Sequence, residues 1–240
     1  MAHKKFTVKA IIGMCLLTLF VSSRGWAQGD LLNDILTKVE NIPAVSYVTL
    51  ESDSVTADRP LPRCIAGDPG ITETKIWVKK GYLRREINSP ASNAKKVIQV
   101  YTPEGGHIYN FYSNETTHYE KSSFVEMPSF TLGIVRKNAD AYKIVGTEML
   151  EDKPTTILEW SYGGDSGDSD DNTVYHAKYW IWNEKGVPLK EETTWIAYKV
   201  LNMKSVEEFK DYSFDDIPES VFDIANIPEI QSSTIVPEKK

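Results

Sequence analysis

Short runs of alternating apolar and polar residues recur along most of the chain, and turn residues separate nearly all of them. Alternation with a period of two residues is typical of a β-strand that buries one face. Clear turn signals include Gly81, Gly105, Gly106 and Pro154. The pattern predicts about eleven strands, at residues 45–51, 72–78, 82–87, 95–101, 107–112, 117–122, 143–149, 155–162, 179–182, 189–198 and 206–214.

The last three of these runs follow one another through tight polar turns and are closed by an Ile-Pro segment that ends at Phe222. Strands joined by short connections pair antiparallel, because a parallel return needs a crossover of about a dozen residues or more. We therefore expect these runs to form an antiparallel meander. A curved sheet of this kind, with aromatic residues on its inner face, makes an apolar container.

Two further segments have the period of a helix. Leu31, Leu32, Ile35, Leu36 and Val39 form one stripe of a 3.6-residue period, with Asp30 as the expected N-cap. Residues 128–135 fit a short helix with proline in its first turn. We expect both helices to cover the concave side of the sheet. The predicted fold is mainly β (α+β): a single curved antiparallel sheet that forms a half-barrel, covered by short helices.

Several strands carry apolar residues on both faces, and tryptophans supply large, stiff surfaces along them. Such residues suit either a plain core or the wall of a ligand cavity, and we expect most of them to be core, because burial alone explains apolar residues in strands. The candidates for the wall of an apolar cavity are Trp77, Leu83, Val97, Tyr101, Ile108, Trp160, Trp180, Trp182 and Trp195.

The first residues have the pattern of a secretory signal peptide. Lys4, Lys5 and Lys9 precede an apolar run at residues 10–21, and small and polar residues follow it. This run is shorter than the ~20 residues that a membrane-spanning helix needs. We expect cleavage after Ala27. Cys15 lies inside the run behind a bulky methionine, which disfavours lipidation. The expected product, residues 28–240, is one exported, unanchored domain with a short polar tail from about residue 231.

Removing residues 1–27 from the 240-residue chain leaves 23 basic and 34 acidic residues, a net charge of −11. Such a charge argues against nucleic acid and against anionic membrane surfaces as partners. The remaining length suits one undivided all-β domain, expected to be a monomer. Cys64 is then the single cysteine, so no internal disulfide is possible. We interpret it as an incidental loop residue, and its role stays open.

The loop at residues 163–172 raises two chemical possibilities. Residues 164–167 read Gly-Asp-Ser-Gly, similar to the nucleophile turn of trypsin-like proteases, but Asp168 replaces the next glycine and no partner histidine fits. Asp165, Asp168, Asp170 and Asp171 offer oxygen ligands to a cation, yet the register of an EF-hand is absent. A solvated acidic loop is the preferred interpretation, with cation binding left open.

The remaining titratable residues do not form a recognisable catalytic or metal motif. His107, His118 and His176 lie one per strand, without the spacing of a zinc site. The adjacent pairs Glu191-Glu192 and Glu207-Glu208 point to opposite faces of their strands and cannot act together as acid and base. We expect no enzymatic activity, no metal and no cofactor.

Taken in order, these elements resemble the LolA/LolB-like superfamily of periplasmic lipoprotein carriers, also described as outer-membrane lipoprotein-sorting proteins. The resemblance spans nearly the whole mature chain. It is carried by the helix at 31–39, the strand pair 74–78 and 82–86 around Gly81, and the hairpin 100–112. Its strongest part is the sequence Tyr-Trp-Ile-Trp at 179–182 with the segments 186–190 and 216–222.

The resemblance implies a half-barrel of about eleven strands, lidded by helices, whose cavity takes the acyl chains of lipoproteins or related lipids. It implies a periplasmic carrier that passes its cargo toward the outer membrane, with an inner-membrane releasing complex and an outer-membrane acceptor as possible partners. In the superfamily a strand arginine helps to hold the lid closed, and Arg84 and Arg85 are the candidates here. Two alternatives stay open: a sensor or protein-interaction module of the RseB type, and a module whose pocket is filled by its own side chains.

Overall fold

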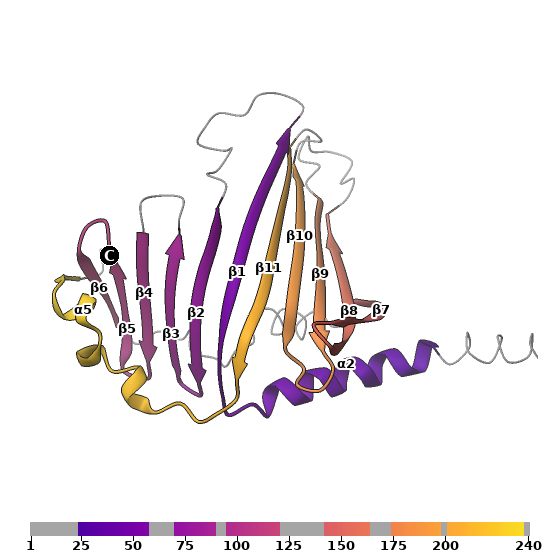
Figure 1. The fold of residues 1–240 in the computed structure, drawn as a ribbon, viewed down its shortest axis with the longest axis horizontal. Coiled ribbons are helices and arrows are strands. Elements are labelled where there is room, and N and C mark those ends of the chain that lie inside the picture. Colours follow the sequence, from indigo (N-terminus) through magenta and orange to yellow (C-terminus); the bar gives the residue numbers. More distant parts are fainter. Residues whose placement is uncertain are drawn as a thin grey trace, which may run out of the picture.

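The computed structural model describes residues 24–57, 70–89, 95–120, 142–163, 174–197 and 201–237, and its centre is one twelve-stranded sheet (Figure 1). The helix α2 (Arg24–Glu40) precedes the sheet, and the short helical elements η3 (Glu219–Val221), η4 (Ile224–Asn226) and α5 (Pro228–Gln231) precede its last strand. The strands are β1 (Ala44–Ala57), β2 (Ile71–Lys79), β3 (Tyr82–Ser89), β4 (Lys95–Thr102), β5 (Gly105–Asn110), β6 (Glu115–Glu120), β7 (Lys143–Leu150), β8 (Lys153–Tyr162), β9 (Val174–Trp182), β10 (Pro188–Ala197), β11 (Leu201–Ser213) and β12 (Thr234–Pro237).

The strand order is β12-β6-β5-β4-β3-β2-β1-β11-β10-β9-β8-β7, so the sheet is open, with β12 and β7 at its edges. The long strands β1 and β11 pair at the centre, and every neighbouring pair is antiparallel except β12 with β6. The predicted fold class is therefore confirmed. The observed sheet has one strand more than the sequence predicted, because β12 lies in the segment that was expected to be a polar tail.

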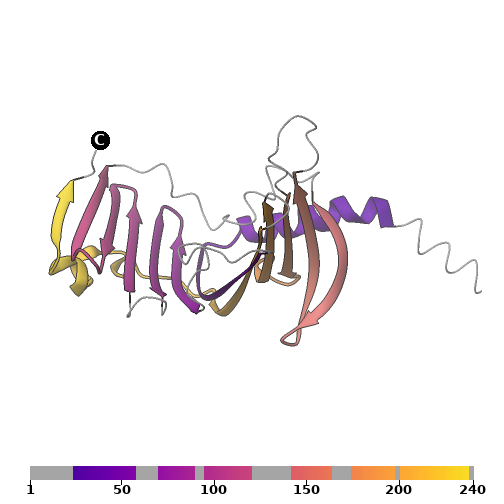
Figure 2. The same cartoon turned by 90° about the horizontal axis from the view of Figure 1, so that it is seen from above.

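The helix α2 covers the concave face of the sheet, as Figure 2 shows from above. The predicted apolar stripe is the buried side of this helix: Leu32, Ile35, Leu36 and Val39 pack against residues of β1, β2, β3, β8, β9 and β11. Close approach of the β9–β10 turn to α2 requires glycine at position 186, since a Cβ there would lie 2.6 Å from the Ile35 carbonyl oxygen. The absence of a side chain at Gly186 thus lets the turn and the helix touch.

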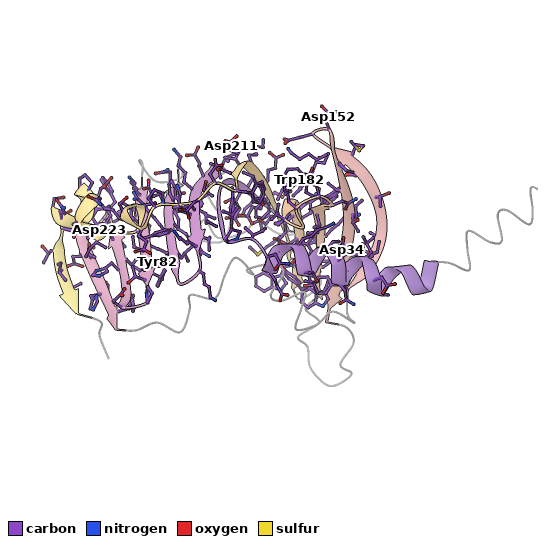
Figure 3. All side chains as sticks on the ribbon, turned by 90° about the horizontal axis from the view of Figure 1, so that it is seen from below. Asp34, Tyr82, Asp152, Trp182, Asp211 and Asp223 are labelled. Atoms are coloured by element: carbon purple, nitrogen blue, oxygen red, sulfur yellow. The ribbon has the colours of Figure 1, made fainter. Side chains whose placement is uncertain are left out.

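The C-terminal segment, residues 214–233, covers the opposite, convex face of β2–β6 (Figures 1 and 2). Its side chains Ile217, Phe222, Ile227 and Ile230 form a buried cluster with residues at the centre of the sheet's first half, which are Ala44, Ile98, Val100 and Tyr109. The ring of Tyr82 lies 5.2 Å from that of Phe222. Figure 3 labels Tyr82 on the sheet and Asp223 on the C-terminal segment. We call this set of residues the convex cluster.

The structure differs from the sequence-based expectation at the N-terminal helix. The helix begins at Arg24, so Asp30 lies inside it and is not its N-cap. The sequence signal for a cap failed because helical residues continue upstream of Asp30, across the expected cleavage position. The predicted helix at 128–135, Cys64 and the four aspartates of the acidic loop lie outside the described residues.

Candidate functional site

A cavity of about 330 Å³ lies between the C-terminal end of α2 and the concave face of the central strands. Its wall comes from α2 and the residues just after it, from β1, β2, β3 and β11, and from the turn before β10. The lining side chains belong to Val39, Ile42, Val45, Tyr47, Thr49, Glu51, Thr72, Thr74, Ile76, Arg85, Ile87, Val187, Pro188, Glu207, Phe209 and Tyr212.

One part of this cavity is apolar. Val39 and Ile42 contribute from the helix side, and Val45, Ile76 and Phe209 from the sheet. These five side chains also belong to the buried cluster beneath α2. Because the strands alternate strictly, each second residue of β1 and β2 faces α2 and the others face away. The alternation therefore places an apolar surface directly under the helix.

The other part of the cavity is polar and carries charge. Glu51 of β1 is paired in register with Glu207 of β11, and Glu207 is paired with Glu191 of β10, so three carboxylates stand side by side on one face. Glu51 and Glu207 line the cavity, together with Arg85 of β3. Burial raises the pKa of the Glu207 carboxyl; the Thr49 side chain and Arg85 oppose this shift, whereas Glu51 adds to it.

Tyrosine rings separate the two parts. Tyr47 stacks on Tyr212 with ring centroids 5.2 Å apart, and the ring of Phe209 lies 6.1 Å from Tyr47. The Tyr212 hydroxyl donates to the Pro188 carbonyl oxygen at 2.6 Å. Burial raises the pKa of the Tyr47 hydroxyl, with Arg85 acting in the opposite direction, so this hydroxyl is neutral at physiological pH. These three rings give the cavity an aromatic wall next to its carboxylates.

A second pocket, of about 390 Å³, lies farther along the same strands. It is lined by Tyr175, Trp195 and Met203 and by polar residues around them, and Trp195 is 43% exposed. In register, Asp53, Ser205 and Thr193 of this pocket follow directly after the row of three glutamates. The two pockets therefore lie in sequence along one face, with the carboxylates between them.

The structure distributes the nine predicted wall residues over both faces of the sheet. Leu83 is buried beneath α2, and Tyr101, Trp160 and Trp182 pack against the same cluster. Val97 and Ile108 pair in register with residues of that face, and Trp195 lines the second pocket. None of the nine is among the side chains that line the 330 Å³ cavity in the described part of the chain. Their role in binding stays a prediction.

Trp77 and Trp180 lie on the face that points away from α2. Trp77 packs against the convex cluster. The Trp180 indole donates to Glu148, and the Lys190 ammonium lies 4.8 Å from its ring centroid. The sequence could not assign these two residues to a face because their neighbours in the strand are also apolar, so both phases of the alternation were possible.

The two candidate lid-holding arginines are adjacent in β3 and therefore face opposite ways. Arg84 donates to the Val221 carbonyl oxygen at 2.8 Å, pairs with Glu86 and stands 5.2 Å over the Trp77 ring. It thus holds the C-terminal segment on the convex face. Arg85 lines the cavity on the concave face, where α2 lies.

Sequence reasoning missed the carboxylate row. Adjacent glutamates along one strand point to opposite faces, as the sequence predicts. The partners that matter come from other strands, and only the register brings Glu51, Glu207 and Glu191 together. No local signal marks them, since the neighbouring residues on the same face, such as Thr49, Thr193 and Ser205, are also polar.

Within the described residues, the structure shows neither a metal site nor a membrane-spanning helix. In the ranges that the structure describes, no three His, Cys, Asp or Glu side chains converge as a metal ion would require. None of the helices within those same ranges is long and apolar enough to cross a membrane.

No protein-family model matches the chain, and no curated protein matches its sequence. In structure, the chain is similar to an uncharacterized conserved protein from Thermus thermophilus, with a TM-score of 0.51 and 11% identity over 86% of this chain and 98% of that one. It is also similar to lipoprotein LppX from Mycobacterium tuberculosis (TM-score 0.41, 11% identity, 79% and 98% of the chains) and to a LolA superfamily protein from Nitrosomonas europaea (TM-score 0.33, 11% identity, 80% and 96%).

At these identities the likeness concerns the fold alone. The predicted half-barrel is the fold observed: an open, mostly antiparallel sheet with a helix on its concave face.

Proposed function

We propose that this protein is an exported carrier that binds acyl chains of lipoproteins or related lipids in the cavity under α2 and passes them toward the outer membrane. The observation that supports this proposal most directly is the 330 Å³ cavity between the helix and the sheet. Its volume lies at the lower end of the range of about 300–1,000 Å³ found for ligand pockets.

Binding by such a cavity requires no chemical step. Each methylene group removed from water contributes roughly 0.8 kcal/mol, so the apolar walls around Val45, Ile76 and Phe209 retain a chain by burial alone. An acceptor with a more apolar site buries the same methylene groups more favourably, so the alkyl chain moves to such an acceptor without any chemical step. A reversible carrier follows from these two properties.

Native mass spectrometry of the protein purified from its producing cells tests the proposal directly. We expect a non-covalent adduct with the mass of a lipid or an acylated peptide, which disappears on organic extraction. Extracted protein should then bind dodecanol, measured by displacement of the neutral fluorescent probe N-phenyl-1-naphthylamine.

A pair of tryptophan substitutions on β3 locates the binding site. Ile87→Trp places a large ring in the cavity, whereas Asn88→Trp places the same ring at the next position, on the other face. We expect Ile87→Trp to weaken dodecanol binding about tenfold or more and Asn88→Trp to leave it unchanged. Protein that carries no adduct and binds no dodecanol would instead favour the protein-interaction module of the RseB type.

A further inference from the structure

The cavity holds two carboxylates that form no ion pair with a lysine or arginine of the described residues. Glu51 and Glu207 stand directly opposite each other on β1 and β11, and both line the cavity. Directly opposite residues of an antiparallel pair have Cβ atoms about 4.5–5.5 Å apart, and like charges in this arrangement destabilise the sheet. Among the described residues, neither carboxylate has a lysine or arginine within ion-pair distance; Glu51 accepts a hydrogen bond from the Ser205 hydroxyl at 3.3 Å.

Carboxylates on the opposite face of the same strands form ion pairs with lysines. Glu208, next to Glu207 on β11, pairs with Lys210 at 2.7 Å. Glu192, next to Glu191 on β10, pairs with Lys190 and Lys204. Because each strand alternates, lysine partners accompany the outward-facing glutamates and are absent beside Glu51 and Glu207. The two cavity carboxylates thus differ from their outward-facing neighbours on the same strands.

A second, independent feature at this place is the hydroxyl of Tyr47. Tyr47 is only 9% exposed, it lines the cavity, and within the described ranges its hydroxyl makes no hydrogen bond. A ligand that supplies a partner to this hydroxyl would gain a hydrogen bond inside the cavity. The rings of Tyr47, Tyr212 and Phe209 also face one another here, and aromatic faces attract cations.

We propose that the cavity selects amphiphiles with a cationic head group, an ammonium that lies between Glu51 and Glu207 and against Tyr47, while the alkyl chain occupies the apolar part under α2. This inference rests on the proposed function and specifies its substrate class. Arg85, on the far side of the cavity across β2 and β1, provides one positive charge against the two carboxylates. The lining thus favours a cation over an anion of the same chain length.

The test compares three probes with identical chains, dodecylamine, dodecanol and laurate, each below its micelle concentration at neutral pH. Displacement of N-phenyl-1-naphthylamine from the full chain reports their affinities. We expect dodecylamine to bind about tenfold more tightly than dodecanol, and laurate to bind no better than dodecanol.

Variants then assign the preference to the carboxylates. The double variant Glu51→Gln/Glu207→Gln should bring the affinity for dodecylamine down to that for dodecanol, with both affinities measured on the same variant and a cooperative unfolding transition as evidence of an intact fold. Glu208→Gln, the same change at the adjacent outward-facing position, should keep the tenfold preference. Tyr47→Phe should reduce the preference by about threefold, because it removes one hydrogen-bonding group and keeps the ring.

The possible failures are distinguishable. If none of the three probes binds, the proposed function itself is wrong. If dodecanol binds but dodecylamine binds no more tightly, or if laurate binds most tightly, the carrier function stands and the cationic specificity is overturned. A loss of preference in Glu208→Gln equal to that in the double variant would also overturn it, since general surface charge would then explain the effect.

Discussion

The two faces of the sheet are built from the same alternating strands, yet they are packed to different degrees. On the convex face, Ile98, Val100 and Ile227 are completely buried and the C-terminal segment fills the surface around them. On the concave face, residues such as Ile35 and Leu158 are completely buried as well, but α2 also leaves a cavity of about 330 Å³ that contains two carboxylates. Both faces therefore contribute buried packing, and the concave face in addition keeps space for a site.

The polar contacts follow the same division. Lys79 bonds Asp216 and the Ile217 carbonyl oxygen at 3.0 Å each, Arg84 bonds the Val221 carbonyl oxygen, and Lys96 pairs with Glu229 at 2.7 Å. Each of these cations fastens the C-terminal segment to the sheet. On the concave face, by contrast, Arg85 lines the cavity.

The largest expected effect comes from removing the centre of the convex cluster. Phe222 is 1% exposed and packs on Tyr82, so Phe222→Ala leaves a large void and should lower the free energy of unfolding by about 3–5 kcal/mol. Urea denaturation measures this loss. Dodecanol affinity of the remaining folded protein should not change. A loss under about 1 kcal/mol, or a loss of binding without unfolding, would contradict the assignment of stability to this face.

A substitution at Gly186 should displace α2, the helix that covers the cavity. This residue has φ +75°, and a Cβ would meet the Ile35 carbonyl oxygen at 2.6 Å and the Lys38 Cβ at 3.1 Å. Gly81 provides the control, because its φ is also positive, +85°, but a Cβ there meets only Pro103 Cγ at 3.5 Å.

We expect Gly81→Ala to cost about 1–2 kcal/mol of stability, the strain of a left-handed residue, and to leave dodecanol binding intact. Gly186→Ala should cost about 1 kcal/mol or more beyond that and also weaken dodecanol binding, because α2 must move. Denaturation and probe displacement give the two quantities. Equal effects of both variants on stability and binding would show that α2 does not close the cavity.

The adjacent arginines of β3 point to opposite faces of the sheet, so substituting each in turn tests one face at a time. Arg84→Gln removes the charged donor to Val221 and should cost about 1.5–3 kcal/mol, with faster amide exchange in residues 219–222. Arg85→Gln should leave that exchange unchanged and alter the affinity for charged probes in the cavity. Hydrogen exchange by mass spectrometry distinguishes them. If Arg85→Gln released the C-terminal segment, the division between the faces would be wrong.

Most strands were predictable because turn residues mark their ends. Residues 82–87 and 143–149, for example, fall inside β3 and β7. Faces were harder to predict where apolar residues are consecutive, as at Ile76 and Trp77, since alternation then fits either phase. Strand β12 was missed because it has four residues and pairs parallel with β6, a contact that local sequence does not encode.

The cavity was predictable as a place on the sheet but not as a set of residues. The helix stripe at 31–39 correctly indicated what covers the concave face. The lining, however, depends on which residues of β1 and β11 stand opposite each other, and register is a property of the folded sheet. Glu51 and Glu207 lie far apart in the chain, so no local pattern joins them.

The smallest expected effect is a change in the free energy of unfolding that depends on the protonation of the Glu207 carboxyl. Burial raises the pKa of this carboxyl above its unfolded value; the Thr49 side chain and Arg85 oppose this shift and Glu51 adds to it. The native state therefore binds the proton more tightly. This group stabilises the fold below its unfolded pKa, and that contribution is lost as pH rises through the folded pKa.

At neutral pH the ionised carboxylate should thus cost stability, and Glu207→Gln should raise the free energy of unfolding by about 0.5–2 kcal/mol. The advantage should disappear in acid, where the wild-type carboxyl is protonated in both states. Thermal unfolding of both proteins between about pH 4 and neutral pH, with Glu208→Gln as the control on the paired, outward-facing carboxylate, measures the difference. A wild-type protein more stable than Glu207→Gln at neutral pH would mean that the cavity already compensates this charge, and the contrast between the two faces would then lie in packing alone.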